Sequence, residues 1–216
     1  MNRHLRMLVA GIALIGGVAA AQADSVPLVF LGSGPAGRYD LRLHGVNMND
    51  VNASWLKFGI GSPSATDYLL CTELTQRVAP RGDFKSYQKI EKNGEIGWLL
   101  NQYEDVMANG GDDRDARAAG LQAAIWEVRY EGEGGNDYDL SDGKFRVRDA
   151  DNSLGEKGLY FAKRYLEDMN GNTADYILYH HDKYQDMVGT APVPEPATFA
   201  ALGAGLLLFR RRKRKA

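Results

Sequence analysis

The chain holds a single cysteine, Cys71, in the stretch YLLCTELTQ. A deprotonated thiol is a strong nucleophile, so this residue is a candidate for covalent chemistry. Two uses of it can be expected. Either Cys71 reacts with another group, or it is a buried thiol that serves packing alone, since free cysteine is among the most buried residue types.

A cysteine hydrolase is the enzymatic form of the first use, and it needs a base beside the thiol. The candidates in the body of the chain are His44, His180 and His181, and the sequence YHHD places Asp182 next to the pair as an orienting partner. The segment around the cysteine carries no local signature of a cysteine protease. The plain alternative for the two adjacent histidines is that they point to opposite faces of a strand, with one exposed.

A glutamine on an apolar helix face is the second candidate for chemistry. Gln122 lies about fifty residues after the cysteine, one turn before Trp126, in a segment with helical spacing of apolar side chains at Ala118, Leu121, Ile125 and Val128. An unpaired buried amide costs about 1–3 kcal/mol, so Gln122 needs partners if this face is buried. From periodicity alone, those partners are backbone groups, or the residue lies at the edge of the apolar stripe.

The elements that must position these residues are predicted by hydrophobic periodicity and turn signals. Runs rich in β-branched and aromatic residues predict strands at 26–31, 38–46, 54–61 and 67–74, so that Cys71 lies on or at the end of a strand. Helical spacing with glycine or asparagine stops predicts helices at 96–111, 112–135 and 156–172, followed by a strand at 174–182. This order predicts an α+β domain, in which N-terminal strands form a sheet or barrel-like core and about three helices pack against it.

The N-terminus has the features of an export signal. Arg3 and Arg6 precede an apolar stretch at 7–20, and the sequence AQA at 21–23 fits the pattern of a signal-peptidase site. We therefore expect a signal peptide over 1–23. An exported protein usually carries cysteines in pairs, so a lone cysteine requires another explanation than a disulfide within the chain.

The C-terminus carries a second targeting segment over 191–216. A Pro-Glu-Pro motif (Pro194, Glu195, Pro196) is followed by an apolar run and a basic tail. As a helix the run spans about 20 Å, which is short of a bilayer core of about 30 Å. This end resembles the PEP-CTERM sorting signal of Gram-negative bacteria that make extracellular polysaccharide. The resemblance implies removal of the helix and tail by an exosortase, a membrane protease.

These two segments predict the location of the protein. We expect export, contact with the inner membrane only through the transient signal and sorting helices, and a final place at the cell surface or in the extracellular matrix. The body between them, residues 24–190, is long enough for one domain with a sizeable core. Eight of the 26 Lys and Arg residues lie in the terminal segments, which leaves 18 in the body against the chain's 28 Asp and Glu. This acidic balance argues against a nucleic-acid partner and is compatible with cationic ones.

No metal or other cofactor is predicted. The segment DMNGNTAD at 168–175 alternates Asp168, Asn170 and Asn172, as calcium loops do, but it lacks the glycine at the sixth position and the glutamate at the twelfth. We interpret it as the stop signal of the preceding helix. The acidic, glycine-rich segment at 134–143 is likewise interpreted as turn chemistry.

The cysteine segment and the glutamine helix together resemble the thioester domain, also called the TQXA domain, of bacterial surface adhesins. In that family the sulfur of a cysteine displaces ammonia from a glutamine amide and leaves an internal thioester. The resemblance covers roughly 60–185 and carries these two residues over to Cys71 and Gln122. The surrounding pattern is matched by Leu70, Leu121, Ile125 and Trp126. The sequence departs from the pattern at Leu121, where the name-giving motif has threonine, and at Thr72, where many relatives have an aromatic residue.

This resemblance implies a reactive binding module rather than a turnover enzyme. An amine, such as a protein lysine or a polyamine on another surface, attacks the thioester, releases the Cys71 thiol and becomes joined to Gln122 by an amide. The resemblance implies that Ile125 and Trp126 wall the pocket. Glu73 is a candidate to orient the amine or polarise the Gln122 amide, and a solvated surface glutamate is the alternative.

Two other functions and two other glutamines remain open at this point. The chain is either a passive extracellular matrix or envelope protein with a buried free thiol, or a cysteine hydrolase that uses Cys71 with His180 or His181. Gln76 lies in the same stretch as the cysteine, but an extended chain places it about 16 Å away at 3.3 Å per residue. Gln122 is therefore the preferred thioester partner, and Gln76 and Gln102 are the alternatives.

Overall fold

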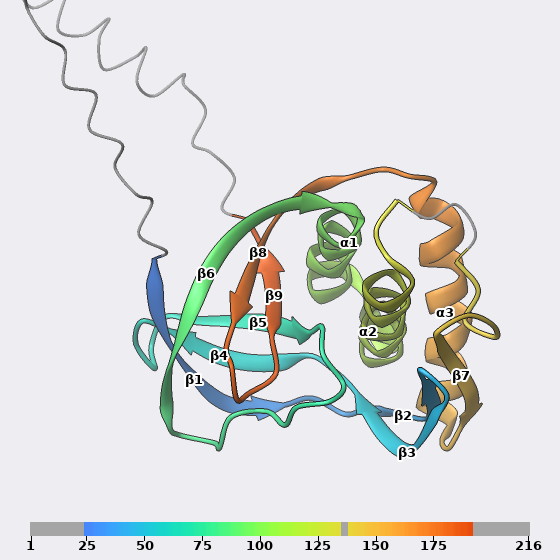
Figure 1. Cartoon of the computed structure of the whole chain (residues 1–216), viewed down its shortest axis with the longest axis horizontal. Coiled ribbons are helices and arrows are strands. Elements are labelled where there is room, and N and C mark those ends of the chain that lie inside the picture. The colour runs from blue at the N-terminus through green and yellow to red at the C-terminus, as the bar shows by residue number, and fades with distance from the viewer. Residues whose placement is uncertain (1–23, 135–137, 192–216) are drawn as a thin grey trace, which may run out of the picture.

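A closed antiparallel barrel forms one half of the protein. The computed structural model describes residues 24–134 and 138–191. Six strands close the barrel in the order β1-β4-β5-β9-β8-β6, as Figure 1 shows. Their bounds are β1 (Ser25–Ser33), β4 (Leu56–Ile60), β5 (Thr66–Cys71), β6 (Phe84–Gly94), β8 (Ala174–His180) and β9 (Met187–Thr190).

A smaller sheet extends from the barrel toward the helices. It has the order β3-β2-β7, with β2 (Gly37–Leu43), β3 (Val46–Ala53) and β7 (Phe145–Ala150). The sequence analysis predicted one strand over 38–46, and this was wrong at its end. The chain reverses at His44 and Gly45, which both have positive φ, at 48° and 86°. Two residues with positive φ form the tight turn that suits a hairpin, so β2 and β3 pair directly.

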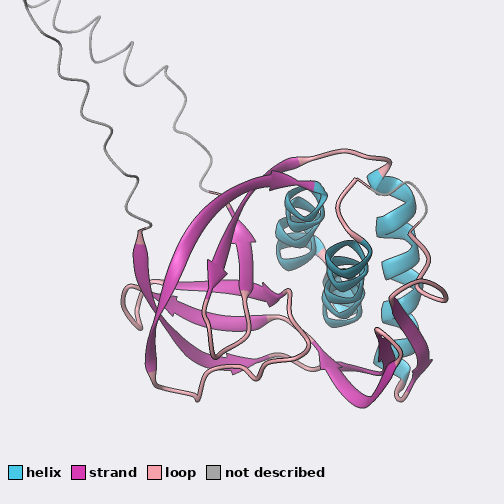
Figure 2. Cartoon of the chain, in the orientation of Figure 1, coloured by secondary structure: helices cyan, strands magenta, loops and turns pink. Residues whose placement is uncertain are grey.

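Three long helices form the other half. They are α1 (Glu95–Asn109), α2 (Arg114–Glu131) and α3 (Ser153–Met169), and a short 3-10 turn η1 (Gly111–Asp113) joins α1 to α2. In Figure 2, α2 lies between α1 and α3, with the barrel on one side of the helices. Every residue of α2 from Ala118 to Val128 is buried. The predicted apolar stripe therefore belongs to a helical segment, 118–128, that is buried on all sides, which explains why small residues fill the positions outside the stripe.

The predicted α+β class and barrel-like core with three helices are confirmed. The predicted strands at 26–31, 54–61, 67–74 and 174–182 correspond to β1, β4, β5 and β8, and the three helices appear within a few residues of their predicted bounds. The core is not made from N-terminal strands alone, because β8 and β9 complete the barrel. The sequence analysis did not predict β3, β6, β7 or β9.

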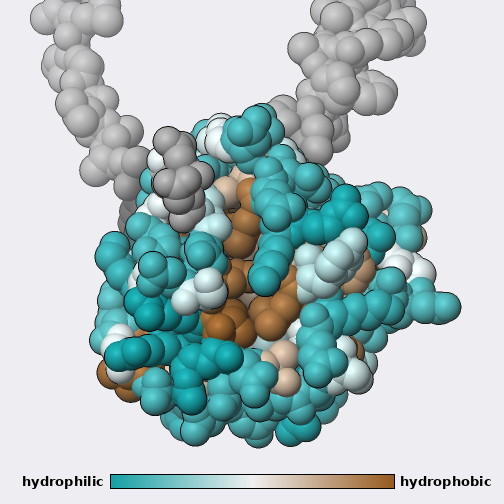
Figure 3. Space-filling model, turned by 90° about the vertical axis from the view of Figure 1, so that its right-hand side faces the viewer, coloured by the Kyte–Doolittle hydropathy of each residue, from teal (hydrophilic) through white to brown (hydrophobic). Residues whose placement is uncertain are grey.

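Some predictions fall outside the described residues. These are the signal peptide at 1–23 and the sorting segment, of which only Ala191 is described, as well as the middle of the turn segment at 135–137. Among the described helices, none combines the length and the hydrophobicity needed to cross a bilayer. Figure 3 looks at the side of the molecule that carries α3 and β7, where a hydrophilic rim surrounds an apolar hollow.

Backbone contact between α2 and α3 fixes the position of the glutamine helix. Gly120 of α2 faces Gly158 and Ala162 of α3, and a Cβ atom at Gly120 would lie 2.9 Å from the Ala162 backbone nitrogen. Real Cβ contacts are not this short, so α3 can lie this close only because residue 120 has no side chain. Alanine would otherwise be the better residue inside a helix by about 1 kcal/mol.

Gly120→Ala is expected to lower the free energy of unfolding by about 1–3 kcal/mol, because overpacking outweighs the gain in helix propensity. Urea unfolding followed by circular dichroism measures the change. Arg129→Ala is the matched control, since Arg129 is an exposed residue of the same helix, and it is expected to stay within about 0.5 kcal/mol of wild type. An equal or higher stability of Gly120→Ala would show that α2 and α3 are less tightly packed than described.

Candidate functional site: a buried cysteine and glutamine

The side chain of Gln122 forms two hydrogen bonds with the main chain of Cys71. The Cys71 N–H donates to Gln122 Oε1 at 3.0 Å, and Gln122 Nε2 donates to the Cys71 carbonyl oxygen at 2.6 Å. The Cys71 sulfur lies 3.5 Å from Gln122 Oε1. Both residues are buried, with 6% and 1% of their surface exposed. The structure thus brings together the two residues that the sequence resemblance paired.

This contact exists because a strand ends early. β4 pairs with β5 only from Leu56 opposite Leu69, and before Leu56 the chain turns away into the other sheet. On its other edge, β5 continues to Cys71, which lies opposite Met187 of β9. Cys71 therefore has backbone groups on the edge that β4 has left. The Gln122 amide, which has one donor and one acceptor side, takes the place of the missing strand.

A cavity of about 300 Å³ lies where β4 leaves β5. Cys71 and Trp126 line it, together with apolar and uncharged polar residues: Phe30, Ser33, Val51, Asn52, Ser54, Leu56, Leu74, Val78 and Gln185. No charged side chain is among these lining residues. A small uncharged group can therefore approach the sulfur through this cavity without meeting a fixed charge.

The surroundings keep the thiol protonated. Burial raises the pKa of Cys71 to about 12, and the Trp126 side chain and the Cys71 backbone act in the opposite direction. A thiol with such a pKa is a poor nucleophile toward soluble reagents, because the thiolate is the reactive form. Reaction with a group already in contact with the sulfur is less affected, since proximity replaces a bimolecular encounter.

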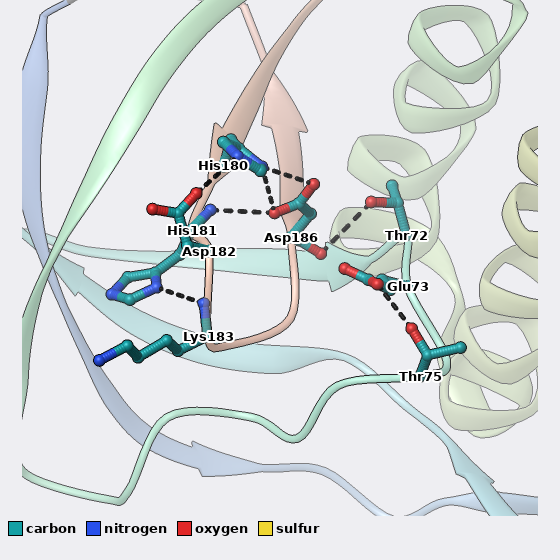
Figure 4. A network of polar contacts seen from close by, with 8 residues as sticks. All are labelled: Thr72, Glu73, Thr75, His180, His181, Asp182, Lys183 and Asp186. Carbon is teal, nitrogen blue, oxygen red and sulfur yellow. Dashed lines mark hydrogen bonds and ion pairs between the residues drawn. The ribbon is translucent and has the colours of Figure 1, made fainter.

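The segment after Cys71 is held by the loop between β8 and β9, as Figure 4 shows. The Thr72 N–H donates to the carbonyl oxygen of Asp186 at 2.9 Å. The Asp186 carboxylate is bonded to Nδ1 of His180 at 2.9 Å and accepts the N–H of His181 at 3.0 Å. His180 is thus engaged with Asp186, and among the described residues no hydrogen bond joins either histidine of this pair to Cys71.

The other predicted site residues lie in different places. Leu70, Leu121 and Ile125 are fully buried in the core. Of the residues that the resemblance assigned to the pocket wall, Trp126 lines the cavity and Ile125 does not. Glu73 is half-buried, does not line the cavity, and accepts a hydrogen bond from Thr75 at 2.6 Å. No hydrogen bond between Glu73 and Gln122 occurs in the described part of the chain.

Tyr130 and Gln185 are site residues that the sequence analysis missed. The Tyr130 hydroxyl accepts the N–H of Leu74 at 2.8 Å, and Gln185 Nε2 donates to the carbonyl oxygen of Glu73 at 2.7 Å. Together they hold the chain that follows Cys71. Tyr130 could have been found, because it lies one turn after Trp126 and two turns after Gln122 on the same helix. Gln185 lies in a loop that carries no such periodic signal.

The segment at 168–175 ends the preceding helix, as its sequence indicated. α3 ends at Met169, and Asn170 has the left-handed conformation, with φ of 43°, that commonly ends helices. Across residues 24–134 and 138–191, no group of three or more His, Cys, Asp or Glu side chains is placed to hold a metal ion.

Comparison with known families identifies the C-terminal segment. Residues 192–215 match the PEP-CTERM protein-sorting motif. The motif marks an exported protein that an exosortase processes at the membrane, and it indicates a place at the cell surface or in the matrix. No curated protein and no solved structure matches the chain.

His180→Ala is expected to reduce stability more at acidic than at alkaline pH. The hydrogen bond to Asp186, with smaller effects of Asp182, raises the pKa of His180 above its ordinary value. Its contribution is therefore fully present below the unfolded-state pKa of about 6.5 and is lost as the pH rises through the higher folded-state value. Urea unfolding at about pH 5 and about pH 9 compares the variant with wild type.

His181→Ala is a control, because the pKa of His181 is shifted in the opposite direction from that of His180. Burial lowers the pKa of His181, so protonation of this histidine opposes folding, and its contribution is lost as the pH falls. The two variants are therefore expected to shift the pH dependence of the unfolding free energy in opposite directions. Parallel curves for wild type and both variants would contradict this assignment.

Proposed function

We propose that Cys71 and Gln122 form an internal thioester that captures an amine, so that the exported protein becomes covalently attached to an amine-bearing surface. The contact between the two side chains is the observation that carries the proposal. The sulfur lies 3.5 Å from the Gln122 carbonyl oxygen, which already accepts the Cys71 N–H at 3.0 Å. A hydrogen bond at this oxygen polarises the carbonyl and stabilises the negative charge that develops on it when a nucleophile adds to the carbon.

Thioester formation conserves every atom of the pair except one ammonia. The Cys71 sulfur attacks the amide carbon of Gln122, a C–S bond forms, and the C–N bond breaks. The nitrogen leaves as ammonia and takes the thiol proton with it. The reaction needs no outside base in its overall balance, which suits a site whose cavity lining has no charged side chain.

Amine capture reverses the roles of the two bonds. The nitrogen of a neutral amine adds to the thioester carbon, the C–S bond breaks, and the sulfur takes a proton from the amine. The product is an amide on Gln122 and a free Cys71 thiol. The uncharged cavity favours the neutral form of an entering amine, because a low-polarity site opposes the charged ammonium form. Its apolar wall suits the alkyl chain of a lysine or a polyamine.

The proposal is tested by intact mass measurement of the purified chain before and after exposure to methylamine. Wild type is expected to lie about 17 Da below its calculated mass, to resist alkylation at Cys71, and to gain one methylamine with release of the thiol. Gln122→Ala and Gln122→Glu are expected to show the full mass and to add no methylamine. The second variant keeps the shape of the side chain, so it separates lost chemistry from lost packing.

Matched controls distinguish the competing functions. Gln76→Ala and Gln102→Ala are expected to behave as wild type, and loss of the ammonia deficit in either one would move the partner away from Gln122. If protein never exposed to amines shows its full calculated mass, and Cys71 is alkylated once the protein is unfolded, Cys71 is a buried free thiol and the thioester is excluded. Repeated turnover of a test amide or ester that disappears in His180→Ala or His181→Ala would instead indicate a hydrolase.

A further inference from the structure

The indole N–H of Trp126 is a buried donor without an acceptor of its own. Trp126 has 1% of its surface exposed. Its Nε1 atom makes no hydrogen bond among the described residues, whereas the indole of Trp55 donates to Asp115 at 3.2 Å. An unsatisfied buried donor costs about 1–3 kcal/mol, and most proteins avoid one unless it has another use.

The place of this donor suggests its use. Trp126 lies one turn after Gln122 on α2, and both Trp126 and Cys71 line the cavity where β4 leaves β5. The Trp126 side chain lies close enough to the thiol to favour its charged form. The Trp126 N–H and the Cys71 sulfur thus belong to residues that line one cavity, whereas Gln122 is not among the lining residues and its oxygen already accepts the Cys71 N–H.

We propose that the Trp126 indole N–H is the hydrogen-bond donor that stabilises the reacting sulfur of Cys71, in a role that rests on the proposed thioester. A neutral thiol or thioester sulfur is a weak acceptor, and a thiolate is a strong one. The N–H is therefore only weakly engaged at rest, and its interaction strengthens as negative charge develops on the sulfur. An interaction that is stronger in the transition state than in the ground state accelerates the reaction.

Both steps place charge on this sulfur. When the thioester forms, the sulfur must lose its proton to attack the Gln122 carbon, and when an amine attacks, the sulfur leaves that carbon with the bonding electron pair. The Trp126 N–H assists both events without gaining or losing an atom. The Cys71 N–H at the carbonyl oxygen and the Trp126 N–H at the sulfur thus divide the developing charge between two donors.

Trp126→Phe keeps an aromatic ring and removes the donor, together with part of the indole volume. In the full chain it is expected to slow methylamine capture by about tenfold, somewhat less than the loss of a donor from an oxyanion hole. Trp98→Phe, at a partly buried position on α1, is the matched control and is expected to react at the wild-type rate. Incorporation of 5-fluorotryptophan nearly keeps the indole shape and makes the N–H more acidic; because it also labels Trp55 and Trp98, it is compared in wild type and Trp126→Phe, and it is expected to raise the rate only in wild type. An unchanged rate in Trp126→Phe, or a fluorinated protein slower than its parent, would overturn the role.

A second measurement separates this role from the proposed thioester. In Gln122→Ala no thioester can form, so the free Cys71 thiol can be alkylated with iodoacetamide in native protein. Addition of Trp126→Phe is expected to slow alkylation several-fold, because less thiolate is present. If wild type shows no ammonia loss, but Trp126→Phe slows alkylation in the Gln122→Ala background, the donor role is retained and the thioester is rejected. If Trp126→Phe leaves alkylation in the Gln122→Ala background equal or faster, the donor role is overturned even if wild type carries a thioester.

Discussion

A buried carboxamide needs two partners, and an interrupted sheet edge leaves two backbone groups without any. The rest of the site depends on the match between these two requirements. β5 extends to Cys71 after β4 has turned away, so that the Cys71 N–H and C=O remain to be paired. Gln122 supplies a donor and an acceptor in the spacing of a neighbouring peptide group. Neither the glutamine on a fully enclosed helix nor the strand end is stable without the other.

The same interruption creates the cavity. The chain joins the barrel only at Leu56, so the space beside Cys71 that a longer β4 would have filled is left as a cavity. The site therefore combines a closely held cysteine and glutamine with a cavity that reaches the cysteine. Rigidity on the glutamine side comes from α2, which packs through glycine against α3. On the cysteine side it comes from β9 and from the Asp186 carbonyl bonded to Thr72.

The sequence predicted much of this arrangement because its signals are local. The periodic apolar residues of the helices and the short apolar run around Leu69 and Leu70 indicate the elements that carry Gln122 and Cys71. The strands that were missed have weaker patterns. β6 is largely exposed and rich in lysine, and β9 is only four residues long. β7 alternates arginine with other residues on an exposed surface.

The details of the site depend on contacts between distant segments. Periodicity places Gln122 on a buried face, but only the early end of β4 shows what that face meets. The engagement of His180 with Asp186 likewise depends on how the loop between β8 and β9 folds back. For the same reason the pocket wall differs from the one expected from the family pattern, with Ile125 in the core and Ser54 and Gln185 at the cavity.

The closed barrel also determines where the two ends of the described body lie. β1 begins beside β6, which pairs on its other edge with β8, and β8 is followed across the sheet by β9. In Figure 1 the start of β1 and the end of β9 lie on the side of the barrel away from the sheet of β2, β3 and β7. A tether at either end, or at both during processing, therefore attaches to the same side of the barrel.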